Sequence, residues 1–125
     1  MARSTVTDPH APEPVGPYSH AVQHAAGPLF VSAQAPLDPT TGRLIEGDME
    51  AQTRQVFANL ESVLAAAGRT LDDVVKVNVY LVDIADFAAM NAVLATVLTA
   101  PYPARTTVAV AALPLGARLE IEIVA

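Results

Sequence analysis

The spacing of hydrophobic residues predicts two helices in the C-terminal two thirds of the chain. Between residues 49 and 67 apolar side chains recur with a helical period, and Gly68 follows where a helix C-cap is expected. A second helix is predicted to begin at the N-cap residue Asp83 and to end before Pro101 and Pro103. The apolar positions are Met49, Val56, Phe57, Leu60, Val63, Leu64 and Ala67 in the first helix, and Ile84, Phe87, Met90, Leu94 and Leu98 in the second.

Other segments have the pattern of β-strands. Residues 21–32 contain two short apolar runs divided by Gly27 and Pro28, which predicts a β-hairpin. Residues 74–81 are rich in β-branched side chains and predict a further strand. The turn-rich stretch 36–47 is predicted to be a surface loop.

The last part of the chain predicts two more strands. Residues 105–111 are rich in Thr and Val, and residues 118–123 alternate strictly between polar and apolar. This alternation places Leu119, Ile121 and Ile123 on one face, and Arg118, Glu120 and Glu122 on the other. The intervening loop 113–116 contains Pro and Gly and favours a hairpin between these two strands.

The element order β-β-α-β-α-β-β predicts one α+β domain over residues 1–125, with a mixed sheet and two helices on one sheet face. The Pro-rich start of the chain, residues 1–17, predicts an extended segment, of which residues 1–12 form a lead-in before the domain. The opposite face of the sheet then needs cover, which a neighbouring subunit could supply.

Composition narrows the classes of protein that this chain can be. Hydrophobic residues make up 52% and charged residues 16%, which is enough for a full core and more than a small monomer needs. The net charge of −6 argues against a nucleic-acid binder or a protein that docks on anionic membranes. The absence of cysteine excludes disulfides and thiolate chemistry. No secretory signal or apolar run of membrane length is present, so we expect a cytoplasmic protein.

Several chemistry-bearing residues have ordinary interpretations. His20 and His24 lie four apart in a predicted strand, too far from each other to share a metal ion, and are expected to be polar strand residues near the surface. Lys76, the sole lysine, is expected to be a solvated strand residue rather than a Schiff-base lysine. No nucleophile elbow or phosphate-binding Gly-rich loop is present, and no cofactor or metal is expected.

Arg105 and Glu120 are the strongest candidates for chemistry. Arg105 stands where a loop enters a strand, and a guanidinium can bind both oxygens of a carboxylate. Glu120 lies in a strand of Leu and Ile, where a carboxylate can position a water or move a proton. From spacing alone, an ion pair for Arg105 and a solvated strand position for Glu120 remain open.

The chain resembles the RidA (YjgF) family of enamine/imine deaminases from about Pro12 to Ala125. The matches are specific because many occur in order along one short chain. They are Val15-Gly16-Pro17-Tyr18-Ser19, Phe30-Val31-Ser32-Ala33-Gln34, Pro36-Leu37-Asp38-Pro39 with Thr41-Gly42, Gln52-Thr53 with Asn59-Leu60, Ala66-Ala67-Gly68, Asp73-Val74-Val75-Lys76, Asp86-Phe87 with Met90-Asn91, Pro103-Ala104-Arg105-Thr106, Leu113-Pro114 and Glu120-Ile121-Glu122.

The resemblance implies a barrel-like homotrimer with active sites in the clefts between subunits. It implies hydrolysis of reactive 2-aminoacrylate-type enamines, as 2-imino acids, to 2-keto acids and ammonia, without a cofactor. By the family pattern Arg105 binds the substrate carboxylate, and Glu120 holds the attacking water and accepts its proton. Tyr18, Ser32 and Asn91 match positions around the cleft, and main-chain groups near Ala33 and Thr107 complete it.

Three positions depart from the family pattern. Ala33 replaces a usual glycine, so its methyl group could narrow the pocket or be harmless. Thr107 replaces a frequent cysteine, which rules out thiol chemistry there. His20 replaces a frequent glutamine beside Tyr18 and either tunes substrate choice or sits at the rim.

The sequence leaves two other functions open. The same trimer could bind a keto acid without turnover and act as a regulatory module, in which case replacement of Glu120 by Gln would leave binding unchanged. A ribonuclease activity has been ascribed to the family, but the net charge of −6 argues against phosphate binding by this chain.

Overall fold

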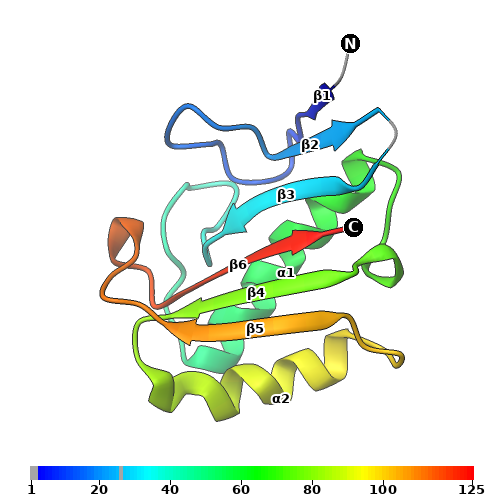
Figure 1. Ribbon diagram of the computed structural model, residues 1–125. Coiled ribbons are helices and arrows are strands. Elements are labelled where there is room, and N and C mark those ends of the chain that lie inside the picture. The colour runs from blue at the N-terminus through cyan, green and yellow to red at the C-terminus, as the bar shows by residue number, and fades with distance from the viewer. Residues whose placement is uncertain (1–2, 26) are drawn as a thin grey trace.

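Six strands form one mixed sheet, and both long helices pack on a single face of it (Figure 1). The computed structural model describes residues 3–25 and 27–125. The strands are β1 (Arg3–Val6), β2 (Ala21–His24), β3 (Leu29–Gln34), β4 (Lys76–Leu81), β5 (Ala104–Ala109) and β6 (Leu119–Val124). The helices are α1 (Met49–Ala66) and α2 (Phe87–Val97), with short 3₁₀ turns η1 (Leu71–Asp73), η2 (Ile84–Asp86) and η3 (Pro114–Gly116). The predicted α+β class with two helices on one face is confirmed.

The core lies between the sheet and the helices. In β4 and β6 alternate residues are fully buried toward the helices, as the period of two requires. Tyr80, Glu120 and Glu122 therefore point to the opposite, open face of the sheet. The buried strand residues are Val77, Val79, Leu81, Leu119, Ile121 and Ile123.

The first helix agrees with its predicted range. The Asp48 carboxylate caps its N-terminus by accepting a hydrogen bond from the Ala51 N–H, and Gly68 follows its end with φ +73°, a conformation that favours glycine. The second helix begins later than predicted. Asp83 caps the 3₁₀ turn η2 instead, and α2 starts at Phe87. No helix in the described ranges is both long and apolar enough to cross a membrane.

The predicted hairpin between the last two strands is wrong. Strand β5 lies at the edge of the sheet and runs parallel to β4, whereas β6 lies between β3 and β4 and is antiparallel to both. Helix α2 provides the crossover that a parallel pair needs. The alternating apolar side chains of β6 are buried best at the centre of the sheet, whereas most of β5 is exposed.

The N-terminal lead-in also takes part in the sheet. Residues 3–6 form the edge strand β1, which pairs antiparallel with β2. The predicted order β-β-α-β-α-β-β therefore lacks this first strand. Residues 1 and 2 lie outside the described ranges. The predicted hairpin of residues 21–32 is confirmed by the pairing of β2 with β3, although its residue 26 lies outside the described ranges. The loop 36–47 is fastened to α1 by Asn59, whose Nδ2 donates to the carbonyls of Ala35 (3.2 Å) and Leu37 (2.9 Å).

Candidate active site

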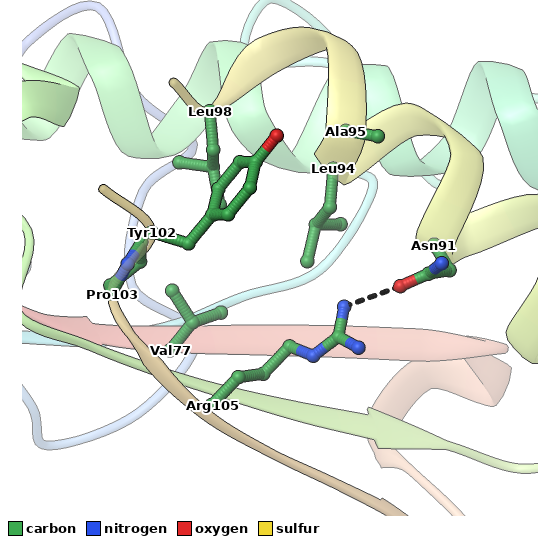
Figure 2. Close-up of a pocket in the computed structure, with 8 residues that line it drawn as sticks. All are labelled: Val77, Asn91, Leu94, Ala95, Leu98, Tyr102, Pro103 and Arg105. Atoms are coloured by element: carbon green, nitrogen blue, oxygen red, sulfur yellow. Dashed lines mark hydrogen bonds between the residues drawn. The ribbon is translucent and has the colours of Figure 1, made fainter. Parts of the chain in front are cut away.

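Arg105 lies in a pocket of about 330 Å³ between α2 and the start of β5 (Figure 2). We call this cavity the Arg105 pocket. Arg105 Nη1 donates a hydrogen bond of 2.7 Å to Asn91 Oδ1, and Arg105 Cζ lies 5.5 Å from the centre of the Phe87 ring. The pocket is otherwise mostly apolar and is lined by Val77, Asn91, Leu94, Ala95, Leu98, Tyr102, Pro103 and Arg105.

Local structure explains why these three side chains meet. Phe87 and Asn91 are four residues apart in α2 and so share one helix face. Arg105 is the register partner of Val77 and points to the helix side of the sheet. Arg105 makes no ion pair within residues 3–25 and 27–125, so the ion-pair interpretation does not hold there. Most of its five N–H donors are left for a ligand carboxylate.

Glu120 lies in a second pocket of about 340 Å³, on the open face of the sheet. We call this the Glu120 pocket. Glu120 is half-buried and makes no side-chain hydrogen bond to any described residue. Burial, and secondarily the charge of Glu122, raises the pKa of Glu120 above its ordinary value. The lining consists of Pro12, Glu13, Val15, Tyr18, Ser32, Ala33, Gln34, Ala35, Leu37, Pro114, Leu115, Glu120 and Glu122.

Three other predicted site residues also line the Glu120 pocket. The Tyr18 hydroxyl accepts a hydrogen bond of 3.3 Å from the Val15 N–H. The Ser32 hydroxyl donates to the Ser19 carbonyl at 2.7 Å, which ties β3 to the N-terminal segment. Ala33 contributes to the wall next to Ser32. Thus Tyr18, Ser32 and Ala33 accompany Glu120 rather than Arg105.

Two further side chains in this region were not singled out from the sequence. The Tyr80 hydroxyl donates a hydrogen bond to Glu122 Oε1, and Asn78 Nδ2 donates to the same oxygen at 3.4 Å. The bond to Glu122, followed by burial, raises the pKa of Tyr80. The alternation of residues 118–123 placed Glu122 on the face of Glu120, but only strand pairing reveals Tyr80 and Asn78 beside them.

Thr107 lies on neither pocket's lining. It follows Arg105 by two residues in β5 and so shares its sheet face. Its Oγ1 is buried and has no hydrogen-bond partner among the described residues. A buried hydroxyl without a partner is unusual and fits a place where a bound molecule completes the hydrogen bonding.

The sheet separates the predicted site residues into two groups. Arg105 and Asn91 meet on the helix side, whereas Tyr18, Ser32, Ala33 and Glu120 meet on the open side. The described lining of the Glu120 pocket includes three carboxylates but no Lys, Arg or His. A single chain therefore does not bring Arg105, the predicted carboxylate anchor, and Glu120, the predicted base, to one cavity.

His20 is not a surface residue, contrary to the prediction. It is only 4% exposed; its Nε2 donates to the Pro12 carbonyl at 2.8 Å, and its Nδ1 accepts from the Asp8 N–H at 3.1 Å. Both ring nitrogens hold the N-terminal segment in place, so His20 neither faces a pocket nor forms its rim. His24, by contrast, is exposed at the end of β2.

The sole lysine has the role expected for a strand residue. Lys76 Nζ donates to Thr106 Oγ1 at 2.9 Å across the β4–β5 pair, on the open face. The described residues contain no group of His, Asp and Glu placed to hold a metal ion.

Comparison with known proteins gives a consistent result over the whole chain. The family model described as Endoribonuclease L-PSP matches residues 8–125. A RutC family protein of Pyrococcus horikoshii is 48% identical over 93% of this chain and 91% of its own length. The 2-iminobutanoate/2-iminopropanoate deaminase of Mus musculus is 40% identical over 100% of this chain and 92% of its own length.

Solved structures agree with these sequence matches. The crystal structure of RidA from an Antarctic Psychrobacter species superposes with a TM-score of 0.92 at 46% identity, covering 97% of each chain. The resemblance inferred from the ordered sequence landmarks is thereby confirmed, and this chain belongs to the RidA (YjgF) family, whose family model is described as Endoribonuclease L-PSP.

Proposed function

We propose that this protein hydrolyses reactive 2-aminoacrylate-type enamines, as their 2-imino acid tautomers, to 2-keto acids and ammonia. The observation that carries the proposal is that the protein has a cationic group in one pocket and a carboxylate in the other. Arg105 presents a guanidinium without an ion-pair partner among the described residues, and Glu120 presents a half-buried carboxylate of raised pKa without a hydrogen bond. The deaminase name of relatives about 40% identical supports this reaction.

The two groups suit the steps of imine hydrolysis. Arg105 binds the substrate carboxylate through two N–H donors and fixes the orientation of the imine carbon. Glu120 accepts a proton from water as the water oxygen bonds to the protonated imine carbon, giving a carbinolamine. Glu120 then returns the proton to nitrogen, and as the C–N bond breaks and ammonia leaves, the carbinolamine hydroxyl becomes the keto-acid carbonyl and gives its proton back to Glu120. The iminium carbon is already electrophilic, so the proposed reaction needs no cofactor.

The site is completed between subunits in this proposal. Arg105 and Glu120 point away from opposite faces of one sheet, so a second copy must bring its own group to the cavity. The open face also exposes large apolar side chains: Phe30 is 53% and Val108 40% exposed. A closed homotrimer, as in the family pattern, would cover this face and pair each Arg105 pocket with a neighbouring Glu120.

RNA cleavage fits the site less well, despite the description of the family model. Three carboxylates line the described part of the Glu120 pocket, and the net charge of the chain is −6. Both would repel a phosphate backbone.

The activity test generates 2-aminoacrylate in situ with a serine or threonine dehydratase and follows keto-acid formation with and without this protein. Wild type should accelerate the reaction, and Arg105→Ala and Glu120→Gln should abolish the acceleration. Arg118→Ala and Glu61→Gln are matched controls, because Arg118 pairs with Asp86 and Glu61 is exposed on α1. Binding of a keto acid by wild type without any acceleration would favour the regulatory trimer instead.

The shared site is tested by mixing the two inactive variants in one oligomer. If Arg105 of one subunit acts with Glu120 of the next, about one site in four of a 1:1 mixture has both groups intact. Activity should therefore return to roughly a quarter of the wild-type value. No recovery in verified mixed oligomers would contradict a site shared between subunits.

A further inference from the structure

We propose that Glu122 is a positioning residue for the reaction: held by Tyr80 and Asn78, it keeps a fixed negative charge beside Glu120, so that Glu120 is the carboxylate that carries the proton. This inference rests on the proposed function and assigns a role to three side chains on the open face of the sheet.

Strand geometry places the two carboxylates together. Glu120 and Glu122 are two residues apart in β6, so they share one face with Cα atoms roughly 7 Å apart. Both line the Glu120 pocket. Their register partners on β4 are Tyr80 for Glu120 and Asn78 for Glu122.

The hydrogen bonds of the two carboxylates differ. Oε1 of Glu122 accepts from both the Tyr80 hydroxyl and Asn78 Nδ2, whereas Glu120 accepts no hydrogen bond from a described residue. Donors to a carboxylate stabilise its ionised form. Of the two carboxylates only Glu122 has such donors among the described residues, so a proton shared by the pair goes to Glu120.

Other charges near the two carboxylates do not move the shared proton from Glu120 to Glu122. From the N-terminal segment, Glu13 adds another carboxylate to the pocket lining. From β4, Lys76 lies opposite Val124 and donates to Thr106. Ahead of β6, Arg118 is held by Asp86 at 3.0 Å. Tyr80, which donates to Glu122, and Tyr18, at the pocket wall, are the remaining ionisable groups that face the pair among the described residues. Strand β3, the open-face side chains of β5 and the loop 110–117 carry none.

The arrangement matters because Glu120 must both take and return a proton. A base accepts a proton from water more readily when its pKa approaches the working pH. Burial and the Glu122 charge both raise the pKa of Glu120. Removal of the Glu122 charge should therefore weaken Glu120 as a base without touching the substrate.

A carbon-13 NMR titration of glutamate side chains tests the inference without substrate. The Glu120 resonance is assigned by its loss in Glu120→Gln. In Glu122→Gln the Glu120 midpoint should fall by about half to one pH unit, as expected for a charge roughly 7 Å away at the edge of a protein. Glu122→Asp, which keeps the charge, and the remote control Glu61→Gln should stay close to wild type.

The pH profile of kcat/KM gives the matching kinetic readout. The acidic limb of this profile should shift to lower pH by a similar amount in Glu122→Gln and should stay at the wild-type pH in Glu61→Gln. Tyr80→Phe keeps the Glu122 charge but removes one donor, so its acidic limb should not move down.

A Glu120 midpoint that stays in place or rises in Glu122→Gln overturns the inference. A lower kcat/KM in Glu122→Gln with the acidic limb at the wild-type pH also overturns it, because it would indicate a structural role only. If Glu122→Gln shows the expected fall of the Glu120 midpoint but the wild-type protein hydrolyses no imine, the proposed function is overturned, while the assignment of the proton to Glu120 stands.

Discussion

Arg105 and Glu120 lie on opposite faces of the same sheet. Arg105 pairs with Val77, which is buried beneath the helices, whereas Glu120 pairs with Tyr80 on the open face. Side chains of one strand pair share a face, so this separation follows from register alone. In a single chain the proposed anchor, Arg105, and the proposed base, Glu120, cannot act on one small substrate.

Arg105→Lys tests the need for a planar guanidinium. Lysine keeps the positive charge but cannot bind both carboxylate oxygens in a fork or stack on Phe87 in the same way. We expect kcat/KM to fall by about 10- to 100-fold, the loss expected for one charge-assisted hydrogen bond and its geometry. Steady-state kinetics on 2-aminoacrylate check this, with Arg118→Lys as the control; near-wild-type activity of Arg105→Lys would refute bidentate binding.

Glu120→Gln should change the pH dependence of stability. The raised pKa of Glu120 means that the folded state favours the protonated carboxyl. Glu120 therefore contributes to the stability of the folded state at low pH, and this stability is lost as the pH rises above 4.5, the ordinary pKa of a glutamate. The variant cannot ionise and should therefore gain stability relative to wild type as the pH rises toward 8.

The expected gain is only about 1–3 °C in Tm near neutral pH, because Glu120 is half-buried and screened by solvent. Thermal unfolding of both proteins from pH 4 to pH 8 measures it. Glu61→Gln controls for the change in net charge. A Tm difference that shrinks toward pH 8 would contradict the sign.

His20→Gln should loosen the N-terminal segment. Glutamine cannot replace both ring nitrogens, so the Asp8 N–H or the Pro12 carbonyl loses its buried partner. The expected loss is about 1–3 kcal/mol of unfolding free energy, the cost of one buried polar group without a partner. Hydrogen exchange should be faster at residues 8–18, and the exposed His10→Gln is the matched control. Unchanged exchange in this segment would remove the fastening role of His20.

Leu115→Gly should stabilise the loop beside Glu120. Leu115 has φ 63°, in the left-handed region, and is 56% exposed, so its side chain contributes little burial. Glycine removes roughly 1–2 kcal/mol of backbone strain and adds about 0.5–1 kcal/mol of entropic cost. A net gain of about 0.5–1 kcal/mol is expected in denaturant unfolding. Leu115→Ala keeps the β-carbon and should show no gain in stability. Equal changes in the two variants would mean that loss of the leucine side chain, and not relief of backbone strain, causes the change in stability.

Local patterns of the sequence were sufficient for the elements whose signal is local. The helical period of residues 49–67 and the strict alternation of residues 118–123 each reflect one buried face, and both correspond to observed elements, α1 and β6. The ordered landmarks around Tyr18, Arg105 and Glu120 were likewise enough to indicate the family.

Pairing between distant segments was decided by the tertiary structure. The loop 113–116 looked like a hairpin turn, but β6 is buried best between β3 and β4, and this removed the predicted contact with β5. His20 looked like a surface residue because its partners, Asp8 and Pro12, come from a segment without regular periodicity.

In the candidate site, too, the sequence predicted the residue types and the tertiary structure decided where their side chains lie. The sequence singled out Arg105 and Glu120 as candidates, and the family resemblance implied a carboxylate anchor and a base for them. Which sheet face each side chain occupies, and that Tyr80 and Asn78 hold Glu122 beside Glu120, depends on strand register. Register is set by how the whole sheet buries its apolar side chains, and no single stretch of sequence contains that information.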